Sequence, residues 1–205
     1  MGYYIFSYGI DFKEVQNSFN SKDQSLFDKI LESEVFDTYA SQDFDGCITT
    51  KEALQNIILG EPYKDNNAHV YGYAFISICA YLGKSVPAGQ EIKLGYETDL
   101  INKYLSTDFG VETEIENILF EDTPALGLPK IEDWPLSGIM RRQELTALQT
   151  RLSPIEITDE QIEDLWDGEE EEDEDKACAY EHIKGIKENI AFCLENNLSF
   201  ISFCH

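Results

Sequence analysis

The chain has 205 residues, which fits one domain, and its hydrophobic content of 42% is enough for a sizeable core. It carries 40 acidic and 15 basic residues, giving a formal net charge of −25. This sign disfavours binding to nucleic-acid phosphates or to an anionic membrane surface, and it favours a basic protein partner. We expect a single domain over residues 1–205.

Cysteine usage and the N-terminal residues both bear on the compartment. The five cysteines are an odd number, and no spacing between them resembles a zinc or redox pair. The opening MGYYIFSYGID has neither the positive leader nor the long apolar core of a signal peptide. We therefore expect a cytoplasmic protein with reduced thiols and no cofactor.

The stretch Asn66–Gly83 is the most distinctive part of the sequence. Every residue of Val70–Leu82 is apolar or aromatic except Gly72 and Ser77. A helix that is apolar all round is buried on all sides or spans a membrane, and this run is shorter than the roughly 20 residues that a membrane span needs. The pattern predicts a buried helix around which the rest of the fold packs, with Gly72 allowing close approach of another element.

The remaining elements follow from periodicity and capping residues, and they predict an α+β fold that is mostly helical. The small sheet is expected to contain the N- and C-terminal strands. The predicted strands are Tyr3–Ile10, Leu136–Met140 and Leu198–Cys204. The predicted helices are Phe12–Phe19, one starting at Ser21 or Asp23, Glu52–Leu59, Asp99–Leu105, Arg141–Leu152, Thr158–Trp166 and Lys176–Asn196. Val111–Phe120 fits either a helix or a strand.

The run Gly168–Asp175, GEEEEDED, is strongly acidic. Runs of like charge are usually solvated and irregular, so we expect a mobile insertion. The run either serves solubility alone or, together with the preceding helix, forms a negative docking surface for a basic partner. The residues predicted to bind that partner are Asp159, Glu160, Glu163, Asp164, Asp167, Glu169, Glu170, Glu171, Glu172 and Asp173.

Ser41–Glu52, SQDFDGCITTKE, has the register of an EF-hand loop. Asp43, Asp45 and Glu52 fall at ligand positions, but Ser41 replaces the usual first carboxylate. The alternative is a turn followed by a capping box, in which Thr49 and Glu52 each accept a hydrogen bond from the other's backbone N–H. Both interpretations, a single degenerate calcium site and a helix start, remain open.

Motifs for nucleophilic, phosphate-binding or metalloprotease chemistry do not occur in the sequence. If the protein is an enzyme, its pocket is expected to gather His69, Glu61, Asp133 and His205. The alternative for His69 is a structural role, because no partner motif accompanies it.

Several short pieces of the chain together resemble a bacterial family of unknown function. They are Ser7-Tyr8 with Asp11, Ser21-Lys22-Asp23 with Leu26 and Ile30, Glu52-Ala53-Leu54, Gly60-Glu61-Pro62, His69–Ala74, Leu126–Pro129, then Asp133, Pro135 and Gly138, and the ending Phe203-Cys204-His205. Members of that family commonly end in Phe-Tyr-His, so Cys204 is a departure. The resemblance implies a shared fold and no particular activity, and the acidic run looks like an insertion.

The leading hypothesis from composition is an acidic cytoplasmic protein that neutralises or docks a basic protein. Bacterial immunity proteins that neutralise toxins are likewise small, acidic and without enzymatic motifs. In that mechanism, carboxylates imitate the phosphate charge that a nuclease toxin binds, and they speed the encounter. The alternatives are an enzyme of unknown reaction and the calcium site.

Overall fold

The computed structural model describes residues 2–40, 45–64, 67–89, 91–120, 126–131 and 134–205. Within these ranges the chain forms strands and helices in the following order: β1 (Tyr4–Ile10), α1 (Phe12–Ser18), α2 (Gln24–Leu31), α3 (Glu34–Ala40), α4 (Thr50–Leu59), α5 (Ala68–Leu82), β2 (Lys84–Ser85), β3 (Ile92–Lys93), α6 (Tyr96–Thr107), α7 (Ile115–Phe120), β4 (Leu136–Met140), α8 (Arg142–Leu152), α9 (Asp159–Trp166), α10 (Glu171–Glu195) and β5 (Ser199–Cys204).

The strands form one antiparallel sheet in the order β2-β1-β5-β4, and β3 also pairs with β1. The terminal strands β1 and β5 are direct neighbours, paired from Ile5 opposite Cys204 to Ile10 opposite Ser199. Strand β4 pairs with the other side of β5. The prediction that both terminal strands share a small sheet is therefore confirmed, and Leu136–Met140 lies beside them.

The alternation of side chains along the strands gives the sheet two apolar faces. In β5, Phe200 belongs to one buried cluster and Phe203 to the other. In β1, Ile5 and Ile10 are divided between the same two clusters. Because successive residues of a strand point to opposite faces, the sheet needs a helical layer on each side.

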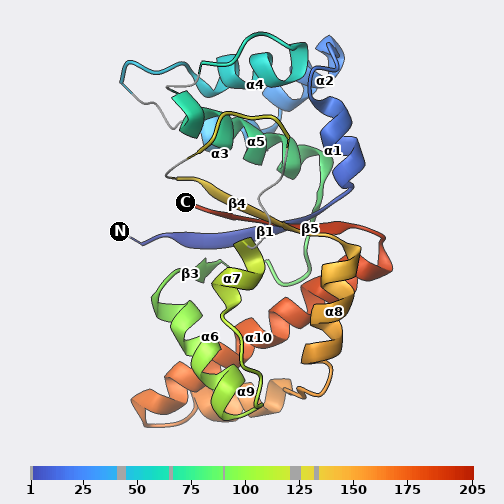
Figure 1. Cartoon of the computed structure of the whole chain (residues 1–205). Coiled ribbons are helices and arrows are strands. Elements are labelled where there is room, and N and C mark those ends of the chain that lie inside the picture. Colours follow the sequence, from blue (N-terminus) through green and yellow to red (C-terminus); the bar gives the residue numbers. More distant parts are fainter. Residues whose placement is uncertain (1, 41–44, 65–66, 90, 121–125, 132–133) are drawn as a thin grey trace.

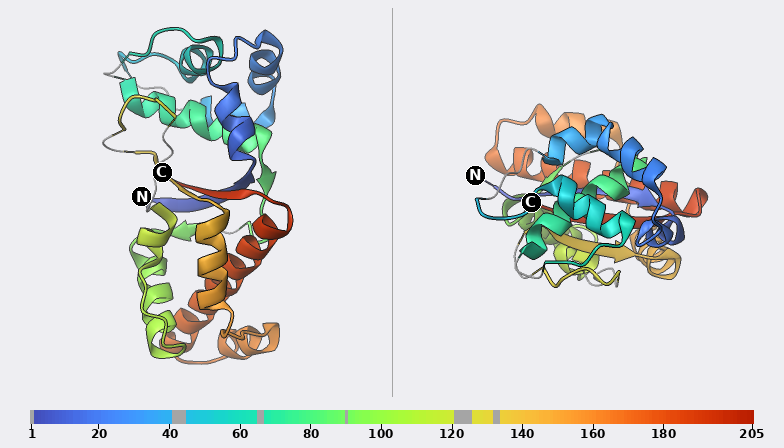
Figure 2. Two further views of the ribbon diagram at one scale, coloured as in Figure 1. Left: turned by 45° about the vertical axis from the view of Figure 1, so that its right-hand side comes forward. Right: turned by 90° about the horizontal axis from the view of Figure 1, so that it is seen from above.

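Two helical layers cover the two faces (Figures 1 and 2). We call α1–α5 the upper layer and α6–α10 the lower layer, as they stand in Figure 1. The α+β class is confirmed. The predicted buried helix is present in the upper layer, while the sheet occupies the middle of the molecule and each of its faces has its own core.

The apolar stretch forms α5, whose residues from Val70 to Cys79 are all buried. A Cβ added at Gly72 would lie 2.6 Å from the Pro135 Cγ, so the close approach predicted at this glycine occurs. Gly83 follows α5 with a φ of −86°, so it is not one of the left-handed glycines that commonly end a helix. No helix in the described part of the chain is both long and apolar enough to cross a membrane.

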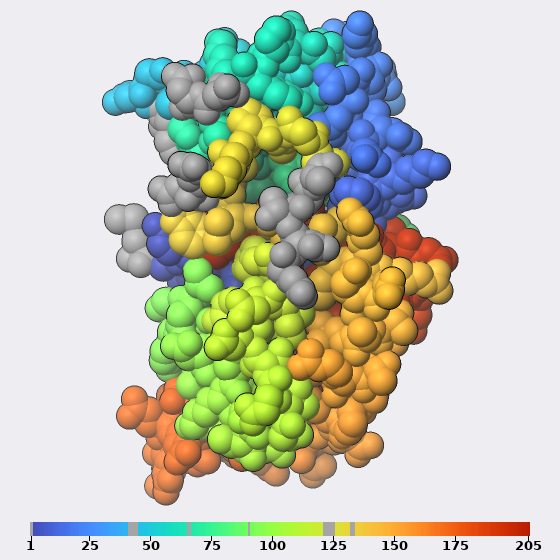
Figure 3. All heavy atoms as spheres, viewed as in Figure 1, coloured from blue at the N-terminus to red at the C-terminus, as the bar shows by residue number. Residues whose placement is uncertain are grey.

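The loop before β4 connects the two layers. Leu126 and Leu128 pack on the upper core, and Figure 3 shows residues 126–131 lying across the upper helices. Trp134 packs on the lower core and stacks on the Tyr3 ring, with the ring centroids 3.8 Å apart. The described part of this loop therefore packs against both cores.

Candidate functional site

The ten acidic residues predicted to bind a partner lie on α9, on the turn after it and on the first turn of α10. Figure 1 places these segments at the end of the lower layer that is remote from the sheet. Asp173 is partly buried and the other nine residues are exposed. We call this set the acidic surface: Asp159, Glu160, Glu163, Asp164, Asp167, Glu169, Glu170, Glu171, Glu172 and Asp173.

Little positive charge balances the acidic surface. Thirteen of residues 152–175 are Asp or Glu, and none is Lys or Arg. Within the described residues, the structure gives ion pairs to two members of the surface: Asp159 pairs with Lys184, and Glu172 lies 3.6 Å from the Lys103 Nζ. Exposed pairs of this kind contribute about 0–1 kcal/mol to stability. The surface therefore retains a strong negative charge.

The expectation of an irregular segment over Gly168–Asp175 is wrong for its last five residues, because α10 begins at Glu171. Four acidic residues occupy the first turn of this helix, where carboxylates interact favourably with the positive end of the helix dipole. Lys176 anchors the following turn through an ion pair of 2.7 Å with Asp108 on the end of α6. The repulsion between the carboxylates of the first turn therefore does not prevent α10 from starting at Glu171, because Lys176 holds the next turn against α6.

The residues predicted for an enzyme active site have different surroundings. His69, on the first turn of α5, places its Nε2 3.7 Å from the Cys47 Sγ. Glu61 follows α4 and accepts a hydrogen bond of 2.7 Å from the Gln55 Nε2. Asp133 lies outside the described residues, so a pocket shared by all four candidates stays a prediction.

His205, the fourth candidate, packs edge-on against aromatic rings of the upper face. Its ring centroid lies 5.4 Å from that of Phe6 and 6.0 Å from that of Tyr39. Burial lowers the pKa of His205, and the carboxylate of Glu91 acts in the opposite direction. A neutral imidazole at pH 7 follows from this environment.

Phe6 and Tyr39 also line a cavity of about 210 Å³ at the edge of the sheet. Strand β3 pairs with Tyr4 and Ile5 of β1, and β2 pairs with Tyr8 and Gly9. The cavity lies beside the part of β1 between these two pairings. Burial raises the pKa of Tyr39 and of its hydrogen-bonded neighbour Tyr8, so both hydroxyls are protonated at neutral pH. His205 therefore contacts two residues of a cavity whose walls combine apolar side chains with the hydroxyls of Tyr8 and Tyr39.

The calcium prediction falls partly on residues 41–44, which lie outside the described residues, Asp43 among them. Asp45 is exposed on the turn that follows. The Glu52 Oε2 accepts a 2.8 Å hydrogen bond from the Thr49 N–H, and the Glu52 N–H donates to the Thr49 Oγ1 at 3.2 Å. These bonds lower the pKa of Glu52, and they confirm the capping box. Calcium binding by Asp43, Asp45 and Glu52 stays a prediction.

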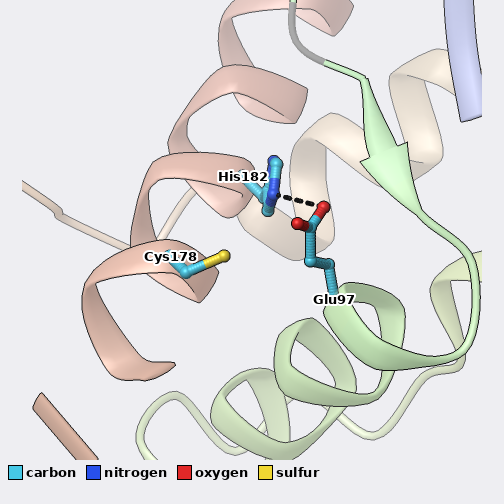
Figure 4. Close-up of side chains that lie close together, drawn as sticks. All are labelled: Glu97, Cys178 and His182. Carbon is cyan, nitrogen blue, oxygen red and sulfur yellow. Dashed lines mark hydrogen bonds and ion pairs between the residues drawn. The ribbon is translucent and has the colours of Figure 1, made fainter. Parts of the chain in front are cut away.

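A second group of polar side chains lies inside the lower layer (Figure 4). Glu97 comes from α6, and Cys178 and His182 come from α10. The donor atoms of the three side chains lie within 4.8 Å of one another. The His182 Nε2 is 3.1 Å from the Glu97 Oε2, which also accepts a 2.7 Å hydrogen bond from the Lys93 N–H. We call these three residues the Glu–Cys–His cluster.

Burial and neighbouring carboxylates set the protonation of this cluster. Burial lowers the pKa of His182, while Glu97 acts in the opposite direction. Burial, together with the nearby carboxylates of Glu97, Glu181 and Asp175, raises the pKa of the Cys178 thiol to about 11. Carboxylate, thiol and imidazole are all ligands that transition metals accept. The cluster can therefore hold a metal ion.

The family model described as Domain of unknown function (DUF7691) matches residues 1–205. The chain belongs to the DUF7691 family. The resemblance to an uncharacterised family is thereby confirmed. No curated protein and no solved structure matches the chain.

The Glu–Cys–His cluster of this DUF7691 member was not predicted from the sequence. Part of the cluster could have been predicted, because Cys178 and His182 are four residues apart and so lie on the same face of a helix. Glu97 has no such local signal. It reaches the cluster because α6 packs against α10, which only the tertiary fold specifies.

Proposed function

We propose that this DUF7691 protein is a cytoplasmic binding protein whose acidic surface binds a basic protein, in the manner of a bacterial immunity protein. The observation that carries the proposal is the concentration of exposed, largely unneutralised carboxylates on α9 and the start of α10. A basic surface on the partner would be complementary to it. The proposal includes a cytoplasmic location, which is supported by five cysteines that form no disulfide.

Long-range attraction is the expected contribution of this surface. At physiological ionic strength the Debye length is about 8 Å, so carboxylates on neighbouring helical turns act together on an approaching cation. Such fields raise association rates about 10- to 1000-fold, and the gain falls steeply with salt. If the partner is a nuclease, the carboxylates would occupy the positions of nucleic-acid phosphates and block its site.

Affinity capture from the native host with charge variants tests the proposal. In the test variant, Glu160, Glu163 and Asp164 of α9 and Asp167 directly after it are replaced by Gln or Asn. In the matched control, the same replacements are made at Glu14, Glu32, Glu34 and Asp37 of the upper layer. All eight residues are exposed, and both variants lose four negative charges.

We expect the wild type and the control to capture a basic protein at low salt and to release it at high salt, whereas the α9 variant captures much less. Failure of the wild type to capture any basic protein at low salt would contradict the proposal. Equal losses in the two variants would show that total charge matters and the position of the surface does not.

A further inference from the structure

We propose that Glu97, Cys178 and His182 form a zinc-binding site that links α6 to α10. The inference does not depend on the proposed partner. Zinc is the ion that fits this donor set best, because it accepts thiolate, imidazole and carboxylate ligands in one tetrahedral site. Calcium and magnesium prefer oxygen ligands alone, so a site containing Cys178 does not suit them.

The distances between the donor atoms fit tetrahedral zinc. With Zn–N and Zn–O bonds of about 2.0–2.1 Å, the nitrogen and oxygen of a tetrahedral site lie roughly 3.3 Å apart. The His182 Nε2 and the Glu97 Oε2 are already 3.1 Å apart. A Zn–S bond of about 2.3 Å requires the sulfur at roughly 3.6 Å from each of them. One donor atom from each of the three side chains lies within 4.8 Å of the other two, so the Cys178 Sγ is near enough to reach a zinc ion held by His182 and Glu97.

The surroundings hold the ligands in place and favour a cation. The Lys93 N–H fixes the Glu97 carboxylate with a 2.7 Å hydrogen bond, which is the kind of supporting contact that metal ligands usually receive. Asp175 lies one turn before Cys178 on the same face of α10, and its Oδ1 accepts a 2.7 Å hydrogen bond from the Tyr96 hydroxyl. The negative charge contributed by the neighbouring carboxylates would attract a divalent ion.

Binding changes the protonation state of Cys178. The metal-free thiol holds its proton at neutral pH, because burial and the nearby carboxylates raise its pKa to about 11. Zinc coordinates the thiolate, so binding releases one proton to solvent and involves no redox change. His182 is neutral at pH 7, since burial lowers its pKa, and it needs no deprotonation. The three protein ligands leave a fourth tetrahedral position for water.

Cobalt(II), a spectroscopic substitute for zinc, tests the site in the full-length chain. A thiolate bound to cobalt gives a charge-transfer absorption in the near ultraviolet, whereas loose binding to surface carboxylates does not. The test variants are Cys178→Ser and Glu97→Gln. The matched control is Cys47→Ser, which removes another partly buried thiol that lies close to a histidine. Far-ultraviolet circular dichroism checks that each variant folds.

We expect the wild type and Cys47→Ser to show the cobalt band with one ion per chain, and zinc to abolish the band by displacement. Cys178→Ser should lose the band and bind zinc at least about 100-fold more weakly, since losing even a supporting contact costs about 10- to 100-fold. Glu97→Gln should keep the band but bind zinc more weakly. A wild type without the band would overturn the proposal, as would a band that Cys47→Ser loses and Cys178→Ser retains.

Discussion

Replacing Gly138 by Ala tests how the sheet and the lower layer fit together. Gly138 lies in β4 opposite Ser202, on the face that the lower layer covers. A Cβ added there would lie 2.5 Å from the Phe120 Cα and still closer to the Leu119 carbonyl oxygen. Both atoms belong to the backbone at the end of α7, so no side-chain rotation relieves the overlap.

The expected cost follows from two opposing effects. Overpacking costs about 1–3 kcal/mol, and a contact with backbone atoms belongs at the upper end of that range. Alanine loses less conformational freedom than glycine on folding, which returns about 0.5–1 kcal/mol. The Gly138→Ala variant should therefore lose about 2 kcal/mol of unfolding free energy, a fall in Tm of roughly 4–8 °C for a chain of this size.

Urea and thermal denaturation, followed by circular dichroism, measure this loss. Ser137→Ala is the matched control, because residue 137 lies opposite Phe203 and so faces the upper layer. Its stability should stay within about 0.5 kcal/mol of the wild type. A Gly138→Ala variant as stable as this control would refute the packing of α7 against β4.

Three further substitutions test local features by denaturation. Thr49→Ala removes the capping box at the start of α4 and should cost about 1 kcal/mol, whereas an unchanged value would show that the cap contributes nothing. Gly72→Ala gains about 1 kcal/mol of helix propensity but overlaps Pro135 at a cost of about 1–3 kcal/mol, so a net loss is expected and a gain in stability would contradict the packing. In the metal-free protein, burial lowers the pKa of His182 below its unfolded value of 6.5, so the folded state binds fewer protons and stability falls as the pH drops below about 6.5. The slope from this residue is at most about 1.4 kcal/mol per pH unit, and His182→Gln should show a shallower decline than the wild type; identical slopes would argue against it.

The sequence identified the elements whose signal is local. The buried helix α5 followed from an unbroken apolar run, and β1 and β5 followed from short aromatic segments. Helix α3 was missed because it is short and begins only three residues after the end of α2, so its pattern did not stand out as a separate helix. Short strands β2 and β3 have only two residues each, and pairing with β1 is what defines them.

The central position of the sheet could not be read from the same patterns. Phe200 and Phe203 belong to separate cores on the two faces of β5. The sequence of β5 does not show that each of these faces has a core of its own. The two-layer arrangement depends on which helices pack on which face. That choice follows from contacts between segments far apart in the chain.

The two candidate sites also differ in whether neighbouring residues in the sequence are enough to predict them. The acidic surface is contiguous in sequence, so its members were identified residue by residue, although the start of α10 was placed too late. The Glu–Cys–His cluster combines a local pair, Cys178 and His182, with a distant residue, Glu97. Only the packing of α6 on α10 creates it.

Zero-length cross-linking with a carbodiimide in native-host lysate tests the proposed function most directly. The reagent couples carboxylates to lysine amines in contact with them, and mass spectrometry then identifies both the partner and the linked residues. The account predicts links from residues 159–173 to lysines of a basic protein, lost when Glu160, Glu163, Asp164 and Asp167 are neutralised. Links concentrated on the acidic residues of α1–α3, or an absence of links to any basic protein, would contradict it.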